Sequence, residues 1–282
     1  MFNSEIEVEH ASTGSGGEVS AEFAYLDWLY RPGFNLRGGL VLLPMGLVNE
    51  LHEPTTFLGA IRPEVEQRIL PSTWRENGVG AFGDVGGFSY RSYVVTGLDG
   101  DGFTATGLRG GRQKGARAKA EDWAWVGRLD WTATPGLLVG VSGYVGDSGQ
   151  GLTGDDGATL GVRTTIWDVH ADWRWRGLRA RGLWTSAELD DVAELNRALG
   201  LEGASSVGSR LEGGYVELGY DLLAGRGGRS SLTPFGRWET VDTQAEVPSG
   251  YSRSGSTRAS SPGFFTTTTW HHRSSAWGGL RR

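Results

Sequence analysis

Residues 164–176 read Thr-Thr-Ile-Trp-Asp-Val-His-Ala-Asp-Trp-Arg-Trp-Arg, and this stretch decides the fold. Side chains of a strand alternate between its two faces. One face would carry Trp167, Val169, Ala171, Trp173 and Trp175, and the other Asp168, His170, Asp172, Arg174 and Arg176. A soluble sandwich can also alternate in this way. The tryptophans favour a membrane, because they precede a turn at Gly177, where a transmembrane barrel carries its aromatic girdle.

The composition is compatible with one large barrel. The 282 residues include 47 glycines and 12 tryptophans, have no cysteine and carry a formal net charge of -6. No apolar run approaches the roughly 20 residues of a membrane helix, so a membrane-spanning structure would have to be a closed barrel. The mildly acidic net charge does not indicate the basic surface that nucleic-acid binding requires. Met1 leads directly into a strand pattern, so we expect the signal peptide to be missing from this chain.

Short connections rich in Gly or Pro alternate with long polar loops along the chain. The short ones lie at residues 31–33, 86–87, 135–136 and 177, and the long ones at 44–77, 99–121, 146–158 and 190–208. The pattern predicts an all-β, antiparallel up-and-down transmembrane β-barrel of which about eleven strands are present within residues 1–250. The alternation stops near Tyr251. We therefore expect residues 251–282 to be an aberrant or disordered tail.

Six segments carry a family resemblance: residues 38–54 (GGLVLLPMGLVNELHEP), 62–66 (RPEVE), 69–80 (ILPSTWRENGVG), 109–113 (RGGRQ), 167–171 (WDVHA) and 242–248 (DTQAEVP). Together they resemble Gram-negative outer-membrane porin-like proteins related to the phosphate-selective porins, over about residues 1–250. The resemblance implies a water-filled barrel of roughly sixteen strands in the bacterial outer membrane, of which this chain would be an incomplete part. Phosphate selectivity is not transferred, because the charges expected in the lumen are of both signs.

Alternation places charged side chains on the lumen face of the predicted strands. The expected pore-lining residues are Arg128, Asp130, Asp168, His170, Asp172, Arg174, Arg179, Arg181, Glu217, Asp221, Arg237 and Glu239. Charges of both signs around a pore create a transverse field that orders water and filters ions, although they can also form salt bridges that only stiffen the wall. On the outer face, the expected membrane girdle consists of Trp123, Trp125, Trp131, Trp167, Trp173 and Trp175.

The segment Pro44–Asn77 is too long for a simple connection, and we predict that it folds into the lumen as a constriction. Its charged residues are Glu50, His52, Glu53, Arg62, Glu64, Glu66, Arg68, Arg75 and Glu76. The alternative is an external loop packed on its neighbours. A basic loop with Arg109, Arg112, Lys114, Arg117 and Lys119 could bind lipopolysaccharide phosphates or simply be solvated.

Two enzyme-like interpretations are weaker. Asp168, His170 and Asp172 could hold a divalent metal with a ligand from a neighbouring strand, but isolated His and Asp on a polar wall need no metal. His52 with Glu53, or Glu64 with Glu66, could act as an acid–base pair in glycoside cleavage, but such pairs are common on loops. We expect no enzyme, no cofactor and no metal site.

The sequence therefore predicts an outer-membrane porin for passive diffusion of small hydrophilic solutes or ions. The expected partners are outer-membrane lipid, lipopolysaccharide and the solutes, with no nucleic acid. Trimers are common among porins, so a homotrimer is a candidate assembly. Two alternatives stay open: a soluble β-rich carbohydrate-binding or carbohydrate-active protein, and a non-conducting barrel that serves as an anchor or adhesin.

Overall fold

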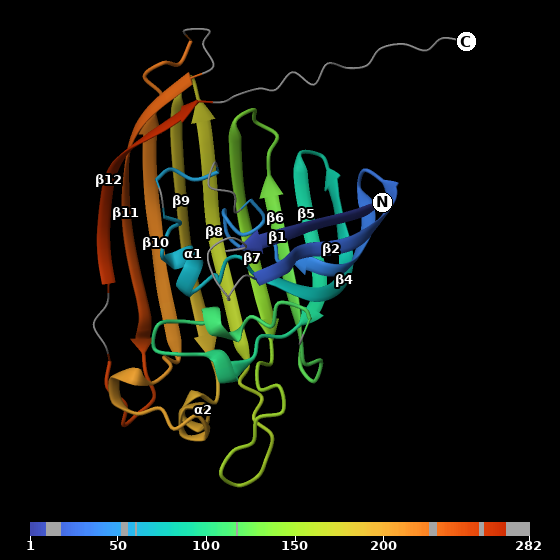
Figure 1. The fold of residues 1–282 in the computed structure, drawn as a ribbon, viewed down its shortest axis with the longest axis vertical. Helices are drawn as coiled ribbons and strands as arrows, with labels where there is room; N and C mark the ends of the chain where they lie inside the picture. The colour runs from blue at the N-terminus through green and yellow to red at the C-terminus, as the bar shows by residue number, and fades with distance from the viewer. Residues whose placement is uncertain are drawn as a thin grey trace.

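The computed structural model describes residues 1–9, 18–51, 56–59, 61–116, 118–225, 230–253 and 257–268. Twelve strands form one sheet in which every strand pairs antiparallel with its neighbours in sequence (Figure 1). The strands are β1 (Phe2–Glu9), β2 (Glu18–Arg31), β3 (Phe34–Leu42), β4 (Arg75–Val85), β5 (Phe88–Thr96), β6 (Trp123–Trp131), β7 (Leu137–Gly146), β8 (Thr164–Trp175), β9 (Leu178–Leu189), β10 (Arg210–Tyr220), β11 (Ser230–Glu246) and β12 (Thr257–Thr268). The helices are α1 (Val65–Arg68) and α2 (Val192–Ala198), with 3-10 turns η1 (Gly100–Gly102), η2 (Arg109–Gly111) and η3 (Gly203–Ser205).

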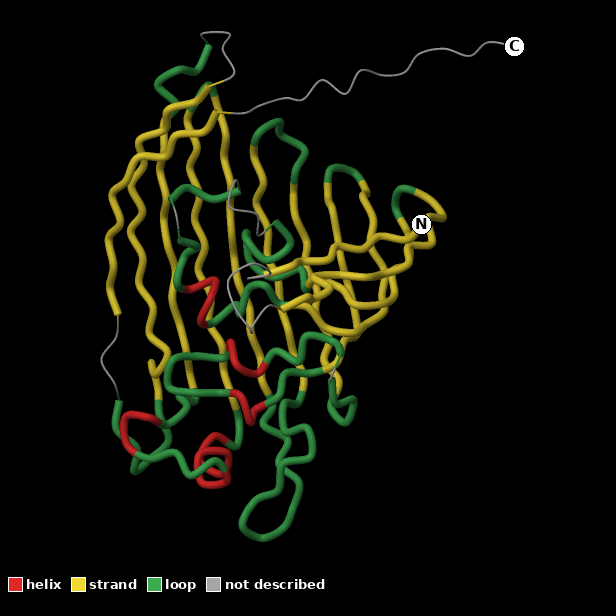
Figure 2. Tube along the Cα trace, viewed as in Figure 1, coloured by secondary structure: helices red, strands yellow, loops and turns green. Residues whose placement is uncertain are grey.

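Short turns gather at one end of the sheet and long loops at the other (Figure 2). The β8–β9 hairpin turns through Arg176 and Gly177, both with positive φ (47° and 87°). Two such residues match the right-handed twist of the flanking strands, which is why a glycine stands there. The loop 190–208 contains the short helix α2. No helix among the described residues is long and apolar enough to cross a membrane.

The sheet is strongly curved but open, because within the described residues β1 and β12 each pair with only one strand. The predicted class, an incomplete antiparallel up-and-down barrel, is confirmed. The strand count differs from the expected eleven, because β12 lies inside the stretch assigned to a tail. Its backbone pairs with β11 from Thr257 to Thr268. Backbone pairing at a sheet edge does not require alternating side chains, so the sequence pattern did not reveal this strand.

The outer face of the sheet is apolar. On β8, Trp167, Val169 and Trp173 are 43%, 45% and 41% exposed, whereas the charged side chains between them are buried. Tryptophans stand eight residues apart on β6 (Trp123 and Trp131), which is about 26 Å along a strand. That separation is close to the apolar band of about 25 Å on transmembrane barrels. All six predicted girdle tryptophans belong to this outer face.

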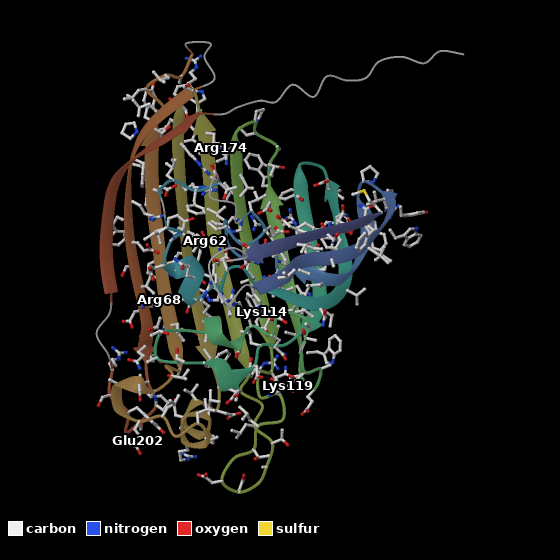
Figure 3. All side chains as sticks on the ribbon, in the orientation of Figure 1. Arg62, Arg68, Lys114, Lys119, Arg174 and Glu202 are labelled. Atoms are coloured by element: carbon white, nitrogen blue, oxygen red, sulfur yellow. The ribbon has the colours of Figure 1, made fainter. Side chains whose placement is uncertain are left out.

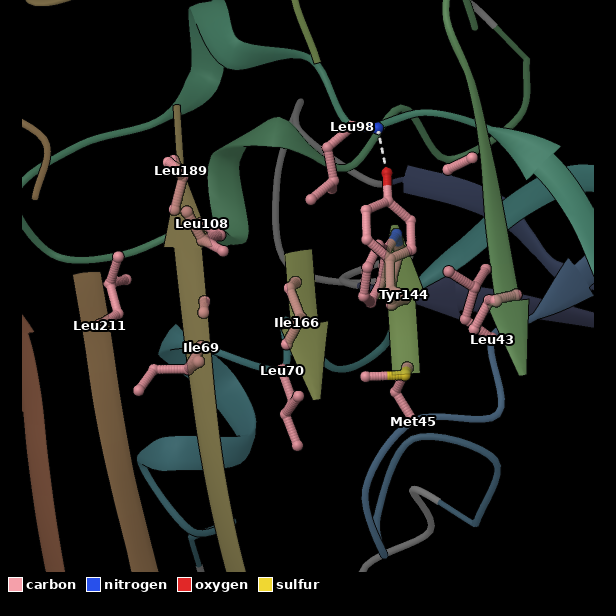
Figure 4. Close-up of a cluster of buried hydrophobic side chains, with 14 of the residues drawn as sticks. Leu43, Met45, Ile69, Leu70, Leu98, Leu108, Tyr144, Ile166, Leu189 and Leu211 are labelled. Carbon is pink, nitrogen blue, oxygen red and sulfur yellow. Dashed lines mark hydrogen bonds between the residues drawn. The ribbon is translucent and has the colours of Figure 1, made fainter. Parts of the chain in front are cut away.

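The hydrophobic core lies on the inner side of the sheet, not between two sheets (Figure 4). Strand residues such as Tyr144 and Ile166 meet loop residues such as Met45 and Leu70, all at most 1% exposed. Trp74 packs on Tyr144 with ring centroids 4.9 Å apart. The Tyr144 hydroxyl accepts a hydrogen bond from the Leu98 backbone N–H at 2.9 Å. The loops at the long-loop end therefore fold inward and fill part of the barrel.

The outer-face assignment predicts a depth-dependent cost of charge. Val169→Arg, in the middle of the outer face of β8, should lower the free energy of unfolding by about 2–4 kcal/mol in lipid vesicles. Thr165→Arg, on the same face near the long-loop end, should cost less than about 1 kcal/mol. Urea titration of the folded protein in vesicles measures both. Equal costs at the two positions would contradict a membrane-facing surface.

Candidate functional site

The described residues within 43–74 (43–51, 56–59 and 61–74), which we call the inward segment, lie against the inner face of the sheet. The short helix α1 stands in the concave side (Figure 1), and Arg62 and Arg68 are labelled beside it in Figure 3. The described part of the segment has little regular secondary structure, so its backbone groups need other hydrogen-bond partners. Charged side chains of the wall supply many of them.

Gly46 marks the first attachment of the inward segment to the wall. Its backbone N–H donates to Asp168 Oδ2 at 3.1 Å, and its carbonyl accepts from Arg128. Gly46 has a φ of +66°, and a Cβ there would stand 2.6 Å from Glu66 Oε2. Glycine is therefore required both by the backbone conformation and by the space. Farther along, Glu50 pairs with Arg91 at 3.0 Å.

Further attachments follow along the inner face of β9 and β11. Arg179 donates to the Thr56 carbonyl, and Arg237 donates to the Ile61 carbonyl at 2.9 Å. Glu239 Oε1 accepts the backbone N–H of Val65 at 2.8 Å, at the start of α1. Predicted pore-lining charges thus hold backbone atoms of the segment that was predicted to form the constriction.

Glu66 organises the inward segment from within. Its Oε2 accepts the backbone N–H groups of Leu47 at 2.9 Å and Val48 at 2.7 Å, and its Oε1 accepts the Tyr215 hydroxyl at 2.7 Å. The side chain is fully buried, and burial raises the pKa of Glu66 above its ordinary value. A carboxylate with three donors is occupied structurally. Glu64 is separate and pairs with Arg68 at 2.7 Å.

The loop between β5 and β6 packs onto the inward segment. The Leu108 backbone N–H donates to the Arg68 carbonyl at 2.8 Å. Arg109 donates to the Ser72 carbonyl, and Arg112 to the Thr73 carbonyl at 2.9 Å. Burial lowers the pKa of Arg109, and it lowers the pKa of Arg112 to about 10. These two arginines face inward, which corrects the prediction of a basic external loop at their positions.

A polar bridge crosses three strands of the wall. His170 Nδ1 lies 2.6 Å from Asp168 Oδ1, and His170 Nε2 lies 3.0 Å from Asp130 Oδ1. Between β6 and β8, Gly140 of β7 pairs in register with both Asp130 and His170. A Cβ at Gly140 would stand 2.1 Å from Asp130 Oδ1, so the glycine leaves the gap through which the bridge passes. Asp168 also accepts the Ser142 hydroxyl.

Asp172 does not join a metal-binding group with Asp168 and His170. Its carboxylate is bound by Arg181 at 2.7 Å and Arg174 at 3.2 Å, and Arg179 lies 3.7 Å away. No group of three or more metal-ligating side chains with suitable geometry occurs among the residues that the structure describes. Asp172 therefore neutralises a local excess of arginine.

The predicted pore-lining set lies on the inner face with one exception, but most of its side chains are covered; Arg174, with 62% of its side chain exposed, is not. Asp168 and Glu217 are each 1% exposed, because the inward segment and its neighbouring loop cover the wall from β6 to β11. Glu217 pairs with Arg237 at 3.4 Å. The exception is Asp221, which follows the end of β10. Its carboxylate accepts the backbone N–H groups of Leu223 and Leu232 and so caps a turn.

The predicted constriction residues do not act as one group. Glu50 and Glu66 bind the wall, Glu64 and Arg68 pair with each other, and Arg62 offers its carbonyl to Gln67 at 3.0 Å. Arg75 and Glu76 instead begin β4. Glu76 turns inward and accepts hydrogen bonds from Thr96 at 3.2 Å and from the Gln113 backbone at 2.9 Å. His52 and Glu53 lie outside the described residues.

The sequence predictions missed a group of partly exposed inner side chains on β2–β5. Arg37 makes two bonds to Asp27, at 2.8 and 3.0 Å. Its guanidinium lies 3.8 Å from the ring centroid of Tyr25 and 4.8 Å from that of Phe82. Together with Arg91, these residues form what we call the open wall. Alternation along residues 18–30 and 88–98 predicts which side chains share a face of one strand. It does not show which side chains of neighbouring strands lie next to each other, so the group could not be recognised from it.

Comparisons with known proteins give one sequence relative. No protein-family model matches the chain. An uncharacterized protein of Aquifex aeolicus (strain VF5) is 38% identical over 265 residues, which cover 89% of this chain and 59% of that protein. The chain thus spans about three fifths of the length of this relative.

Solved outer-membrane structures are similar to the chain at low sequence identity. A loop L8 deletion mutant of OmpT, an outer membrane protein of Vibrio cholerae, gives a TM-score of 0.49 at 10% identity, over 85% of this chain and 68% of that one. A porin refined at 1.8 Å gives a TM-score of 0.41 at 11% identity, over 86% and 75% of the two chains. The fold class itself rests on the strand order and register of this chain.

The polar bridge predicts that Gly140 cannot tolerate a side chain. Gly140→Ala should cost about 1–3 kcal/mol of unfolding free energy, because its Cβ would displace Asp130 and His170. Gly143→Ala on the same strand is the matched control, since its nearest neighbour would be 3.8 Å away. Chemical unfolding in detergent micelles compares the two variants. Similar costs would show that the bridge does not depend on the gap.

Glu66 predicts a pH dependence with a defined sign. Because burial raises its pKa in the folded state, folding favours the protonated form, and stability should fall as pH rises from the ordinary carboxyl range through the folded pKa. Glu66→Gln should remove that contribution to the slope and keep the fold. Glu66→Ala should cost about 1–3 kcal/mol for each donor left unsatisfied. Urea unfolding at several pH values tests this, and an unchanged slope in Glu66→Gln would contradict it.

Proposed function

We propose that the chain belongs to an outer-membrane porin that allows passive diffusion of small hydrophilic solutes or ions. The observation that supports this best is the contrast between the two faces of one curved sheet. The outer face is apolar and carries tryptophans near both ends, whereas the inner face is charged. An apolar outer face of this extent would be unfavourable in water, whereas lipid around the sheet would cover it.

The solute path in this proposal runs along the open wall. Most charged inner side chains from β6 to β11 are buried, with the exception of Arg174, whereas Arg37, Arg91 and Glu50 keep 19%, 28% and 20% of their side-chain surface exposed. The path would pass between the inward segment and β2–β5. Charges of both signs line it, as a hydrated filter requires. The neighbouring inner positions of β1 and β2 add Glu5, Glu7 and Glu22.

A second candidate function is a barrel that does not conduct and serves as an anchor or adhesin. It is favoured by the extent to which the inward segment covers the wall. Seven wall side chains bind the segment by hydrogen bonds or ion pairs, at Gly46, Glu50, Thr56, Ile61, Val65 and Glu66. The two candidates share the fold and the membrane. They differ only in whether ions pass.

Conductance of the full-length protein in a planar bilayer tests the porin proposal. Wild-type protein should form ion channels, and Arg37→Gln should shift the reversal potential in a KCl gradient toward cation preference, because it removes a positive charge from the open wall. Arg176→Gln is the matched control and should leave the preference unchanged, because Arg176 is exposed in the short turn after β8 and its guanidinium lies over the Trp175 ring. Absence of conductance in protein that has folded would favour the anchor.

Heat modifiability on a gel decides between the membrane barrel and the soluble carbohydrate-active alternative. A folded membrane barrel should require detergent and migrate differently before and after boiling. A protein that stays in solution without detergent and acts on a glycan would overturn the proposal. No enzymatic step is part of it, since Glu66 is occupied by three hydrogen-bond donors and Glu64 by Arg68.

A further inference from the structure

A cavity of about 810 Å³ lies at the long-loop rim of the sheet. Its strand residues are Val19, Ser20, Ala21, Leu40, Arg75 and Asn77, and residues 113–116 of the loop between β5 and β6 complete the lining. On β4, Arg75 and Asn77 alternate in step with Val79, which is 58% exposed on the outer face. The cavity therefore opens on the outer side of the sheet. A volume of this size lies within the range of about 300–1,000 Å³ typical of small-molecule sites.

Arg75 is the unusual member of the cavity lining. The residue is only 6% exposed, and its Nε is buried without a hydrogen-bond acceptor. Among the residues that the structure describes, no carboxylate pairs with its guanidinium. A buried cation without a counter-charge is costly, so a guanidinium in this position indicates a missing anionic partner.

The loop that covers the cavity adds a second cation. Lys114 lines the cavity, and its loop is held by a bond from Asn77 Nδ2 to the Gly115 carbonyl at 2.9 Å. Lys114 is labelled in Figure 3. The adjacent carboxylate of Glu76 is not available to either cation, because it faces inward and binds Thr96 and Gln113. The lining thus combines two cations with the apolar Val19, Ala21 and Leu40, and it also includes the neutral polar residues Ser20, Asn77 and Gln113.

We propose that this cavity binds the phosphate and part of one acyl chain of a phosphorylated lipid of the outer leaflet. Arg75 and Lys114 would bind the phosphate through charge-assisted hydrogen bonds, and Val19, Ala21 and Leu40 would contact the chain. The location supports a lipid over a dissolved anion, because the cavity lies on the lipid-facing side at the rim. The inference rests on the proposed membrane location, but not on conduction.

The test uses the full-length protein folded in detergent and diphosphoryl lipid A as the probe. Native mass spectrometry counts bound lipid as its concentration is raised. Arg75→Gln and Lys114→Gln should each weaken binding about tenfold or more, as expected for a lost charge-assisted contact. Lys119→Gln is the matched control, because Lys119 belongs to the same loop but pairs with Asp99 at 3.0 Å and does not line the cavity. Lys114 is exposed, so its variant should fold even if the Arg75 variant does not.

Two further probes distinguish a lipid site from a site for small anions. The first probe is lipid A without its phosphates, which should bind wild type no better than it binds Lys114→Gln. The second probe is inorganic phosphate, which should not displace diphosphoryl lipid A when both are present at equal concentration. Displacement by phosphate would overturn the lipid assignment, as would equal weakening by Lys119→Gln. Heat modifiability and conductance are measured on the same samples. Folded, conducting protein without lipid binding refutes this inference alone, and lipid binding without conductance refutes only the porin proposal.

Discussion

Buried charged side chains hold an irregular backbone against the inner wall, and the arrangement inside the sheet depends on this interaction. Most of these wall groups bind a carbonyl or an N–H that has no partner in a helix or strand, as Arg237 does for Ile61 and Glu239 for Val65. One such hydrogen bond stabilises two groups at once, because a buried charge and a buried peptide group are each costly without a partner. Removal of one partner leaves the other unsatisfied, so the wall and the inward segment stabilise each other.

The same logic explains why the wall has charges of both signs. Peptide N–H groups need acceptors and carbonyls need donors, so a wall that holds backbone requires carboxylates and guanidinium groups side by side. At Gly46 the two occur together, with Asp168 on the N–H and Arg128 on the carbonyl. A mixed-sign wall is thus not sufficient to indicate ion filtration. The exposed inner charges, which are those of the open wall and Arg174 at the short-turn end of β8, remain available for that role.

The sequence was sufficient to predict faces, but not what would cover them. Alternation between Trp167 and Trp175 identified the outer and inner sides of β8 correctly, because it depends only on strand geometry. The burial of Asp168 depends on Gly46, which is 122 residues away, and the position of Glu66 depends on Tyr215, which is 149 residues away. Nothing local in either stretch specifies those contacts. The strand β12 escaped prediction for a related reason, since its pairing with β11 is made by backbone groups.

Charged side chains that have a partner within the chain and those that lack one therefore have different roles in this fold. A charge such as Asp172, surrounded by arginines and covered by the inward segment, serves the architecture. Arg75 sits at the rim with neither a carboxylate nor a carbonyl to bind within the described chain, although its neighbour Glu76 has several donors. Internal pairing thus satisfies the charges on the inner side and leaves a cation on the lipid side. Arg179, Arg237 and Glu217 each also keep one buried side-chain atom without a hydrogen bond, but each of them has an ion-pair partner. Arg75 has no such partner within the described chain, and this difference is the basis for proposing an anionic ligand there.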